Sequence, residues 1–255
     1  MPMPLSDEQD VLAAMIAGAN RIVAFTGAGL STECGIPDFR SPNSPWMRAK
    51  PIDFHAFMAS EQSRREAWRR KFAIDDLMAH AEPGRGHRAL ARLVENGRMS
   101  AVITQNIDGL HQRSGIAESQ IIELHGNGTY AACLGCGRRH ELAPIRRAFE
   151  ATGTLPHCTC GGIVKAATIS FGQPLPAAAM LRARQAAREC DLFIAIGSSL
   201  VVHPAAGLPI LAKHNGAKLL IVNAQGTPLD ALSDGLLHGD IGTLFEHIDV
   251  RRHTN

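Results

Sequence analysis

The residues best suited to chemistry follow a short apolar run near the start of the chain. The run at 22–25 (IVAF) stops at the glycine turn 26–29 (TGAG), which is typical of a buried strand that enters a turn. Glycines let the backbone approach a pyrophosphate closely, and amides that open the next helix can point at the anion. A lone Gly-Ala-Gly is about equally compatible with an ordinary tight turn. The loop at 35–40 (GIPDFR) favours a nucleotide phosphate site, because surface turns do not require so specific a sequence.

Two further polar clusters follow apolar runs, at 105–109 (QNIDG) and at His125 beside its glycines. The carboxyl ends of the strands form the ligand crevice of an open α/β sheet, so we expect both clusters to face one site. Among the 12 histidines, His125 is the functional candidate, because its position after a strand places a titratable imidazole at this crevice. His87 and His111 lie within helical patterns, where a structural role is more natural.

Four of the 6 cysteines form two close pairs that predict a metal site. Cys133 and Cys136 form a C-x-x-C pair, and Cys158 and Cys160 form a C-x-C pair. Tetrahedral zinc takes four such ligands from two turns. His157 is the chemical alternative to Cys158, since it stands in an H-x-x-C relation to Cys160. We favour four cysteines, and with no acidic residue nearby we expect a structural Zn²⁺ rather than a catalytic one.

The elements that must position these residues alternate between strands and helices. Apolar runs predict strands at 22–25, 100–104, 120–124, 166–171, 191–196 and 218–222, with helical patterns at 6–18, 86–96, 176–189 and 204–215. This alternation predicts an α/β fold with a doubly wound, parallel, Rossmann-like sheet. The segment 41–82 is predicted to be helical, and 236–250 to form a short strand and a closing helix.

The cysteine segment and the helical segment interrupt this pattern, which predicts one large domain with a smaller inserted lobe. We expect the nucleotide-binding domain at 1–45, 83–130 and 165–255. The smaller lobe is expected to combine a helical module at 46–82 with a zinc-binding module at 131–164.

Composition limits the class of protein. A chain of 255 residues with 45% hydrophobic content can bury a large core. A net charge of +2 gives no reason to expect a nucleic-acid partner, and the arginine-rich patches at 64–71 are expected to be a solvated helix face. No apolar run is long enough for a membrane span, and the polar N-terminus resembles no secretion signal. We therefore expect a cytoplasmic protein, and in the absence of any recognisable oligomer interface, a monomer.

Seven motifs in order resemble those of the sirtuins, the NAD-dependent protein lysine deacylases, and especially their single-domain bacterial members. They are GAGLSTECGIPDFR, TQNIDGLH, ELHG, the two cysteine pairs, SFG, GSSLVVHPAA and IVN, and they extend over nearly the whole chain. The resemblance implies a reaction in which NAD loses nicotinamide and the acyl oxygen of an acylated lysine captures the ribose carbon. The products would be free lysine, nicotinamide and an O-acyl-ADP-ribose.

Matching positions imply specific roles. His125 would be the general base that deprotonates a ribose hydroxyl, Asn106 would orient ribose and water, and Asp108 would hold the nicotinamide carboxamide. Phe39 and Arg40 would cover the reacting ribose and contact phosphate. The other implied NAD contacts are Gly27, Ala28, Gly29, Ser31, Asp38, Gln105, Ile107, Gly197, Ser198, Ser199, Asn223 and Gln225, with Asp240 and Ile241 near the adenine. The substrate peptide would add as a strand beside Ile169, Phe171, Gly172, Val201 and Val202.

The acyl group is less defined by the resemblance. The desuccinylating branch of the family carries a Tyr-x-x-Arg in its helical segment, whereas this chain reads WRRKFAIDDLM at 68–78 and has its only tyrosine at Tyr130. We therefore expect acetyl or longer apolar acyl groups to be preferred over acidic ones.

Three other functions compete with deacylation. A protein mono-ADP-ribosyltransferase would share the first chemical step. A hydride-transferring dehydrogenase is disfavoured, because no acidic residue follows a second strand about 20 residues after the glycine turn. A non-catalytic NAD-sensing module is disfavoured by the complete set of crevice residues.

Overall fold

The larger part of the molecule is built on a parallel sheet. The computed structural model describes residues 4–38, 44 and 50–246. Its 6-stranded sheet has the order β3-β2-β1-β7-β8-β9, and all of its pairings are parallel. The strands are β1 (Ile22–Thr26), β2 (Met99–Thr104), β3 (Ile121–Glu123), β7 (Leu192–Ile196), β8 (Lys218–Val222) and β9 (Gly235–Leu237). The predicted α/β fold is confirmed.

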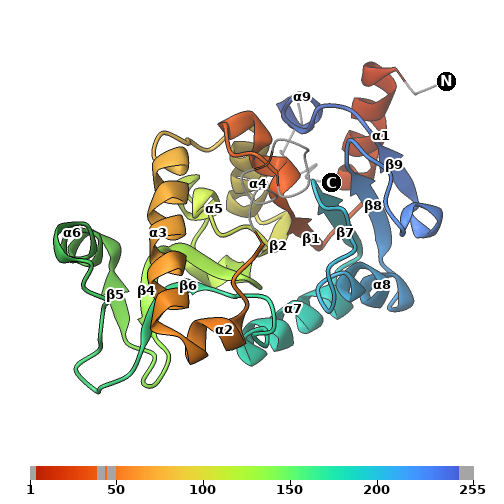
Figure 1. Ribbon diagram of the computed structural model, residues 1–255. Coiled ribbons are helices and arrows are strands. Elements are labelled where there is room, and N and C mark those ends of the chain that lie inside the picture. The colour runs from red at the N-terminus through yellow and green to blue at the C-terminus, as the bar shows by residue number, and fades with distance from the viewer. Residues whose placement is uncertain (1–3, 39–43, 45–49, 247–255) are drawn as a thin grey trace.

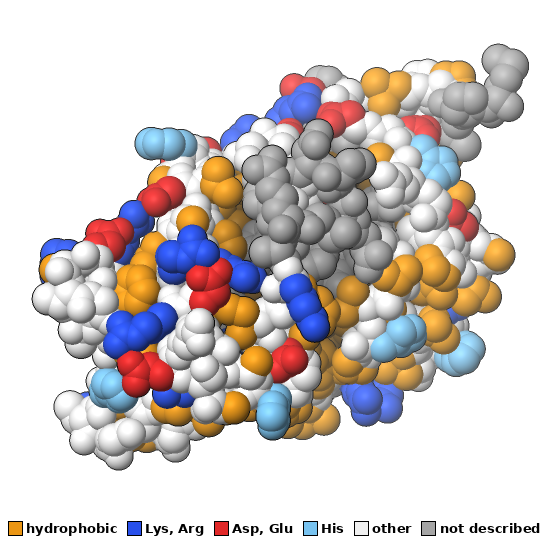
Figure 2. Space-filling model, in the orientation of Figure 1, with side chains coloured by type: hydrophobic (Ala, Val, Ile, Leu, Met, Phe, Trp, Pro, Cys, Tyr) orange, Lys and Arg blue, Asp and Glu red, His pale blue; other side chains and the backbone are white. Residues whose placement is uncertain are grey.

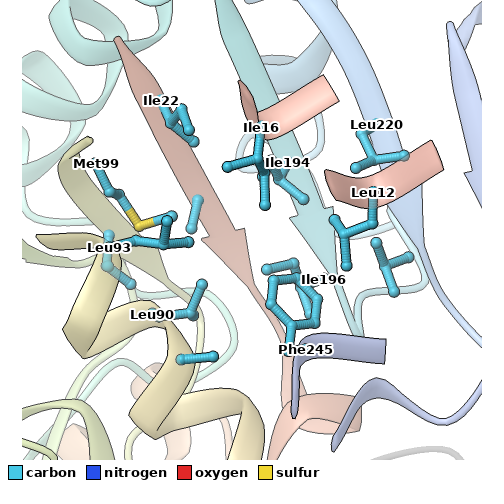
Figure 3. Packing of buried hydrophobic residues seen from close by; sticks show 14 of the residues in the cluster. Leu12, Ile16, Ile22, Leu90, Leu93, Met99, Ile194, Ile196, Leu220 and Phe245 are labelled. Carbon is cyan, nitrogen blue, oxygen red and sulfur yellow. The ribbon is translucent and has the colours of Figure 1, made fainter. Parts of the chain in front are cut away.

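Helices cover both faces of this sheet (Figure 1). One face packs against α1 (Leu5–Ala17), α4 (Arg85–Glu95) and α9 (Ile241–Glu246), and the other against α7 (Ala177–Glu189) and α8 (Gly207–His214). Successive side chains of a strand point to opposite faces, so Ile194 joins the first core and Phe193 the second. In Figure 3, Leu12 of α1 and Phe245 of α9 lie beside the sheet residues Ile194 and Ile196. Burial on both faces explains why these strands are continuous apolar runs.

A second, antiparallel sheet forms the smaller part of the molecule. Its 3 strands have the order β5-β4-β6. They are β4 (Gly126–Cys133), β5 (Arg139–Glu141) and β6 (Val164–Thr168), and the neighbouring helices are α2 (Phe54–Ala59), α3 (Glu61–Met78) and α6 (Leu142–Thr152). Trp68 and Phe72 of α3 stack with ring centroids 5.4 Å apart and pack against Ala131 and Val164 of this sheet.

The strand predicted at 166–171 does not belong to the parallel sheet, so that prediction was wrong. It is β6, and it pairs antiparallel with β4. The sequence did not reveal β4, because its first residues (GNG) are typical of a turn and its burial alternates instead of forming an apolar run. The sixth parallel strand is β9. The small sheet therefore extends beyond the 131–164 expected for the zinc module.

Arg65 and Arg69 of α3 are solvated, as predicted for the arginine-rich patches, whereas Lys71 of the same patches is largely buried and lines the cleft. Arg65 pairs with Glu61, and both Arg69 and Arg70 pair with Glu66, within the same helix. Lys and Arg side chains gather over this part of the surface in Figure 2. Such ion pairs between residues three or four apart on a helix contribute only about 0.2–0.5 kcal/mol each. Separately, none of the described helices is both long and apolar enough to cross a bilayer.

Candidate active site and metal centre

The carboxyl ends of the central parallel strands open into one large cleft, with a volume of about 1520 Å³. One wall carries residues that follow β1, β2, β7 and β8, among them Gly27, Asn106, Gly197 and Asn223. The opposite wall carries residues of α3 and of the β6 end of the small sheet, such as Thr168. The site therefore lies between the two parts of the molecule, where the sequence predicted a crevice.

The glycine turn after β1 lines the cleft, and close packing against the turn after β7 also requires its glycines. The N–H of Gly29 donates to the carbonyl of Gly197 after β7, at 2.9 Å. A Cβ on Gly27 would lie 2.6 Å from that carbonyl oxygen, which is too close for any side chain. The next residues form a 3₁₀ helix, η1 (Ala28–Cys34). The two strand ends can therefore approach each other only because both turns contain glycine.

Asn106 and Asp108 are joined through Ser31. The amide Nδ2 of Asn106 donates to the carbonyl of Gly27 at 3.0 Å and to Ser31 Oγ at 3.2 Å. The Ser31 hydroxyl donates to Asp108 Oδ2 at 2.7 Å. The other oxygen of Asp108 accepts the N–H of Leu110, at 2.9 Å. Each polar group of this cluster is held in one orientation before any ligand enters, which is the condition for preorganised recognition.

His125 lies at the cleft, and a hydrogen bond to a neighbouring carbonyl determines which of its ring nitrogens carries the proton. Its Nδ1 is 3.1 Å from the carbonyl oxygen of Gln105, and because a carbonyl only accepts, Nδ1 carries the proton. The lone pair is therefore on Nε2. Burial lowers the pKa of His125 below its ordinary 6.5, although the Gln105 hydrogen bond opposes this shift. The imidazole is accordingly neutral at pH 7, in the state that accepts a proton.

The structure brings nearly all of the predicted cleft residues together. Gln105 Nε2 donates to Ser198 Oγ at 2.8 Å, and Asn223 Nδ2 donates to the carbonyl of Gln225 at 2.6 Å. The predicted residues that line the cleft are Gly27, Ala28, Gly29, Ser31, Asp38, Gln105, Asn106, Ile107, Asp108, His125, Ile169, Phe171, Gly172, Gly197, Ser198, Ser199, Val202, Asn223, Gln225, Asp240 and Ile241. Val201 is 40% exposed and is not part of this lining. Phe39 and Arg40 lie outside the described residues.

Sequence reasoning missed Lys165, which also lines the cleft. Its side chain donates to the carbonyls of Ala166 and Thr168, and Lys165 is only 5% exposed. Burial lowers the pKa of its ammonium to about 8. The one available signal was a single cation inside the otherwise apolar run 163–167.

The two cysteine pairs converge on one point. The Sγ atoms of Cys133, Cys136, Cys158 and Cys160 all lie within 4.8 Å of one another. His157 is exposed and does not belong to this group. The backbone N–H of Cys136 lowers the pKa of Cys133 to about 6, and that of Cys160 lowers the pKa of Cys158 to about 7. The N–H of Gly162 also lowers the pKa of Cys160, but its three cysteine neighbours raise it to about 12.

Such a cluster favours thiolates at two positions and opposes the accumulation of further negative charge. A divalent cation at its centre would offset the repulsion among the thiolates. Four sulfur ligands without an open position are typical of structural zinc. The four cysteines therefore fit a structural Zn²⁺ site. Cys158, and not the alternative His157, belongs to the cluster.

Comparisons with known proteins agree with this architecture. The Sir2 family model matches residues 27–204. The chain is 58% identical over 239 residues to an NAD-dependent protein deacetylase of Rhodopseudomonas palustris, which covers 93% of this chain and 94% of the relative. It is 57% identical over 229 residues to NAD-dependent protein deacetylase 1 of Bradyrhizobium diazoefficiens, covering 89% and 90%.

Solved structures give the same result. A Sir2 complex with a p53 peptide and NAD⁺ matches with a TM-score of 0.82 and 34% identity, covering 95% of this chain and 96% of the other. Sir2Tm bound to a propionylated peptide matches with a TM-score of 0.81 and 34% identity, covering 93% and 95%. The family model matches more than half of the chain, and these relatives are more than 30% identical to it over most of their length, so the chain belongs to the Sir2 family, the sirtuins.

Proposed function

We propose that this protein removes acyl groups from protein lysine side chains with NAD as the cosubstrate, releasing nicotinamide and O-acyl-ADP-ribose. The observation that carries the proposal is a neutral His125 at the cleft, with Nδ1 bonded to Gln105 and the lone pair of Nε2 available. The hydrogen-bonded Asn106 and Asp108 lie at the same cleft. Relatives that are 58% and 57% identical to the chain are named NAD-dependent protein deacetylases, and another, 38% identical, is named a deacylase.

Each of these side chains has a role that its geometry supports. NAD supplies the ribose carbon that the acyl oxygen captures. His125 accepts a proton at Nε2 from a ribose hydroxyl, since its Nδ1 proton is held by Gln105. Asn106 orients the ribose and a water, and Asp108 holds the carboxamide of nicotinamide. Gly27, Gly197 and Ser198 bind the phosphates, while Asn223, Asp240 and Ile241 lie toward the adenosine end.

The substrate peptide is proposed to bind where β6 leaves the small sheet. The N–H of Ile169 is bonded to the carbonyl of His125 at 2.8 Å, which ties this segment directly to the candidate base. Phe171 is 56% exposed, and its carbonyl accepts the N–H of Phe54 at 2.9 Å. A strand added between this segment and Val201–Val202 would gain main-chain hydrogen bonds. The relatives solved with a propionylated peptide and with a p53 peptide support a peptide substrate.

We propose that apolar acyl groups are preferred over acidic ones. The two lysines that line the small-lobe side of the cleft are already engaged: Lys71 pairs with Asp75, and Lys165 donates to backbone carbonyls. An acyl carboxylate would have to displace those partners. Matched peptides that carry acetyl-lysine and succinyl-lysine test this, and we expect turnover of the succinyl peptide to be slower. Equal rates for the two peptides would overturn it.

Transfer of ADP-ribose to a protein side chain is the alternative reaction of the same site. Incubation with NAD labelled in its adenosine half separates the two reactions. Deacylation places the label in O-acyl-ADP-ribose, whereas the alternative places it on protein. A cytoplasmic location, a monomeric state and the lack of a nucleic-acid partner stay predictions from the sequence.

A further inference from the structure

Two buried histidines lie behind the cleft wall, and the proposed reaction does not use either of them. His87 of α4 is 0% exposed, and His111 of the short helix α5 (Leu110–Arg113) is 1% exposed. Neither lines the cleft. Their ring centroids are 5.0 Å apart, and each has one ring nitrogen without a hydrogen-bond partner, Nε2 in His87 and Nδ1 in His111. A buried polar atom without a partner costs about 1–3 kcal/mol, so such a pair calls for an explanation.

The proton on His111 is fixed by the threonines at the ends of β1 and β2. Thr26 Oγ1 donates to Thr104 Oγ1 at 2.8 Å. A hydroxyl has one proton to give, so His111 Nε2, which is 2.9 Å from Thr26 Oγ1, must be the donor in that contact. The unpaired Nδ1 of His111 is therefore an acceptor. Burial lowers the pKa of His111 to about 3, so the ring carries a single proton at neutral pH.

The proton on His87 is fixed in the same way from the other side. The backbone N–H of Gly84 points at His87 Nδ1 at 3.4 Å, and the thiol of Cys34 lies 3.7 Å from the same atom. Burial raises the pKa of Cys34 to about 11, so its sulfur keeps its proton at pH 7. Both neighbours are donors, which makes Nδ1 the acceptor. The unpaired Nε2 of His87 is therefore a donor, and it complements the unpaired acceptor of His111.

The hydrogen bonds that start at His111 continue through Thr26 and Thr104 to Asn106 of the candidate active site. The backbone N–H of Asn106 donates to Thr104 Oγ1 at 3.0 Å. Thr104 Oγ1 thus accepts from both Thr26 and Asn106. The orientation of the Thr104 hydroxyl, and with it the backbone of Asn106, depends on groups that lie behind the sheet end.

We propose that one buried water joins Nε2 of His87 to Nδ1 of His111, and that the resulting hydrogen-bonded chain from Gly84 to Thr104 holds Asn106 in its reactive position. A water needs two to four polar partners in such a site, and it would accept from His87 and donate to His111. His87, His111, Thr26 and Thr104 are then positioning residues. This inference rests on the proposed function only where it refers to the reaction.

The first test needs no activity. The ¹⁵N shifts of the imidazoles in the wild-type protein report which nitrogen carries the proton. We expect Nε2–H in both His87 and His111, and Nδ1–H in His125, which donates to a carbonyl and serves as the internal control. A crystal structure should show a water within hydrogen-bond distance of both unpaired nitrogens. An Nδ1–H form of either buried histidine, or no water between the two rings, would overturn the proposal.

The second test separates positioning from a merely structural role. Thr104→Val removes the acceptor while keeping the side-chain shape, and Thr104→Ser keeps the acceptor. Loss of one buried hydrogen bond corresponds to about a tenfold change, so we expect kcat for deacylation to fall about tenfold in Thr104→Val with KM for the peptide little changed, and Thr104→Ser to restore most of it. Equal activity of the two variants contradicts positioning. A wild-type protein without deacylase activity would instead refute the proposed function and leave the proton assignments standing.

Discussion

The two sheets of this molecule hold together for different reasons. Every residue of β1 and β7 is buried, because helices cover both faces of the parallel sheet. In the small sheet, burial alternates along β4 and no residue of β5 is fully buried. The buried core of the small part includes two of the metal-site cysteines, Cys133 and Cys158. We therefore expect the large part to keep its core without the metal, and the small part, which carries the proposed peptide segment, to depend on it.

Metal removal should have the largest effect, because the metal-site cysteines belong to the core of the small part alone. Structural zinc in small modules contributes about 10–16 kcal/mol of apparent binding free energy. On chelation, or in Cys133→Ser, we expect the amides of β4 and β6 to lose protection from hydrogen exchange while those of β1 and β7 keep it. Peptide turnover should disappear, since Ile169 is bonded to His125.

Cys190→Ala is the matched control for metal removal, because Cys190 is a buried cysteine outside the metal cluster. It should leave the zinc content unchanged. Equal loss of protection in both sheets after chelation would show that the two parts fold as one unit.

Truncation of one buried aromatic ring in each part should weaken the two parts separately. Phe193→Ala in the large core and Trp68→Ala in the small one each remove a fully buried ring, at a cost of about 3–5 kcal/mol. We expect Phe193→Ala to lower the free energy of global unfolding, and Trp68→Ala to weaken mainly the small sheet and its metal affinity. Denaturant titration followed by hydrogen exchange checks both, and reversed effects would contradict the division.

Acid should weaken the large part through His111. Its pKa is about 3 in the folded protein and near 6.5 in the unfolded chain, so between these values the unfolded state binds the extra proton. Stability from this group is therefore complete above pH 6.5 and declines as pH falls, by up to about 1.4 kcal/mol per pH unit. His111→Gln should flatten this slope in urea titrations at several pH values. An unchanged slope would show that His111 does not control the acid limb.

The strands of the parallel sheet could be predicted from sequence more accurately than those of the small sheet. Strands buried on both faces are continuous apolar runs, so β1, β7 and β8 were found close to their true bounds. The alternating β4 was not found, and β6 was assigned to the wrong sheet as a result. The cysteine ligands were predictable, because their chemistry is local in sequence.

The hydrogen-bonded chain through His111 was not predictable from sequence. Its members come from β1, β2, α4 and α5, and only the fold brings them together. Both histidines were given a structural role from their helical context, and their exact partners required the tertiary structure. Predicted cleft residues such as Gln105, Gly197 and Asn223, by contrast, lie directly after strands, where the topology of a parallel sheet brings them to one edge.

The most direct test of the proposed deacylation is mass spectrometry of acetyl-lysine and longer acyl-lysine peptides incubated with NAD, with the wild-type protein and with His125→Ala. We expect the wild type to yield free lysine, nicotinamide and O-acyl-ADP-ribose. We expect turnover by His125→Ala to fall by about 10²–10⁴, the usual contribution of a general base. A wild type that consumes NAD and leaves every peptide acylated, or a His125→Ala variant as active as the wild type, would contradict it.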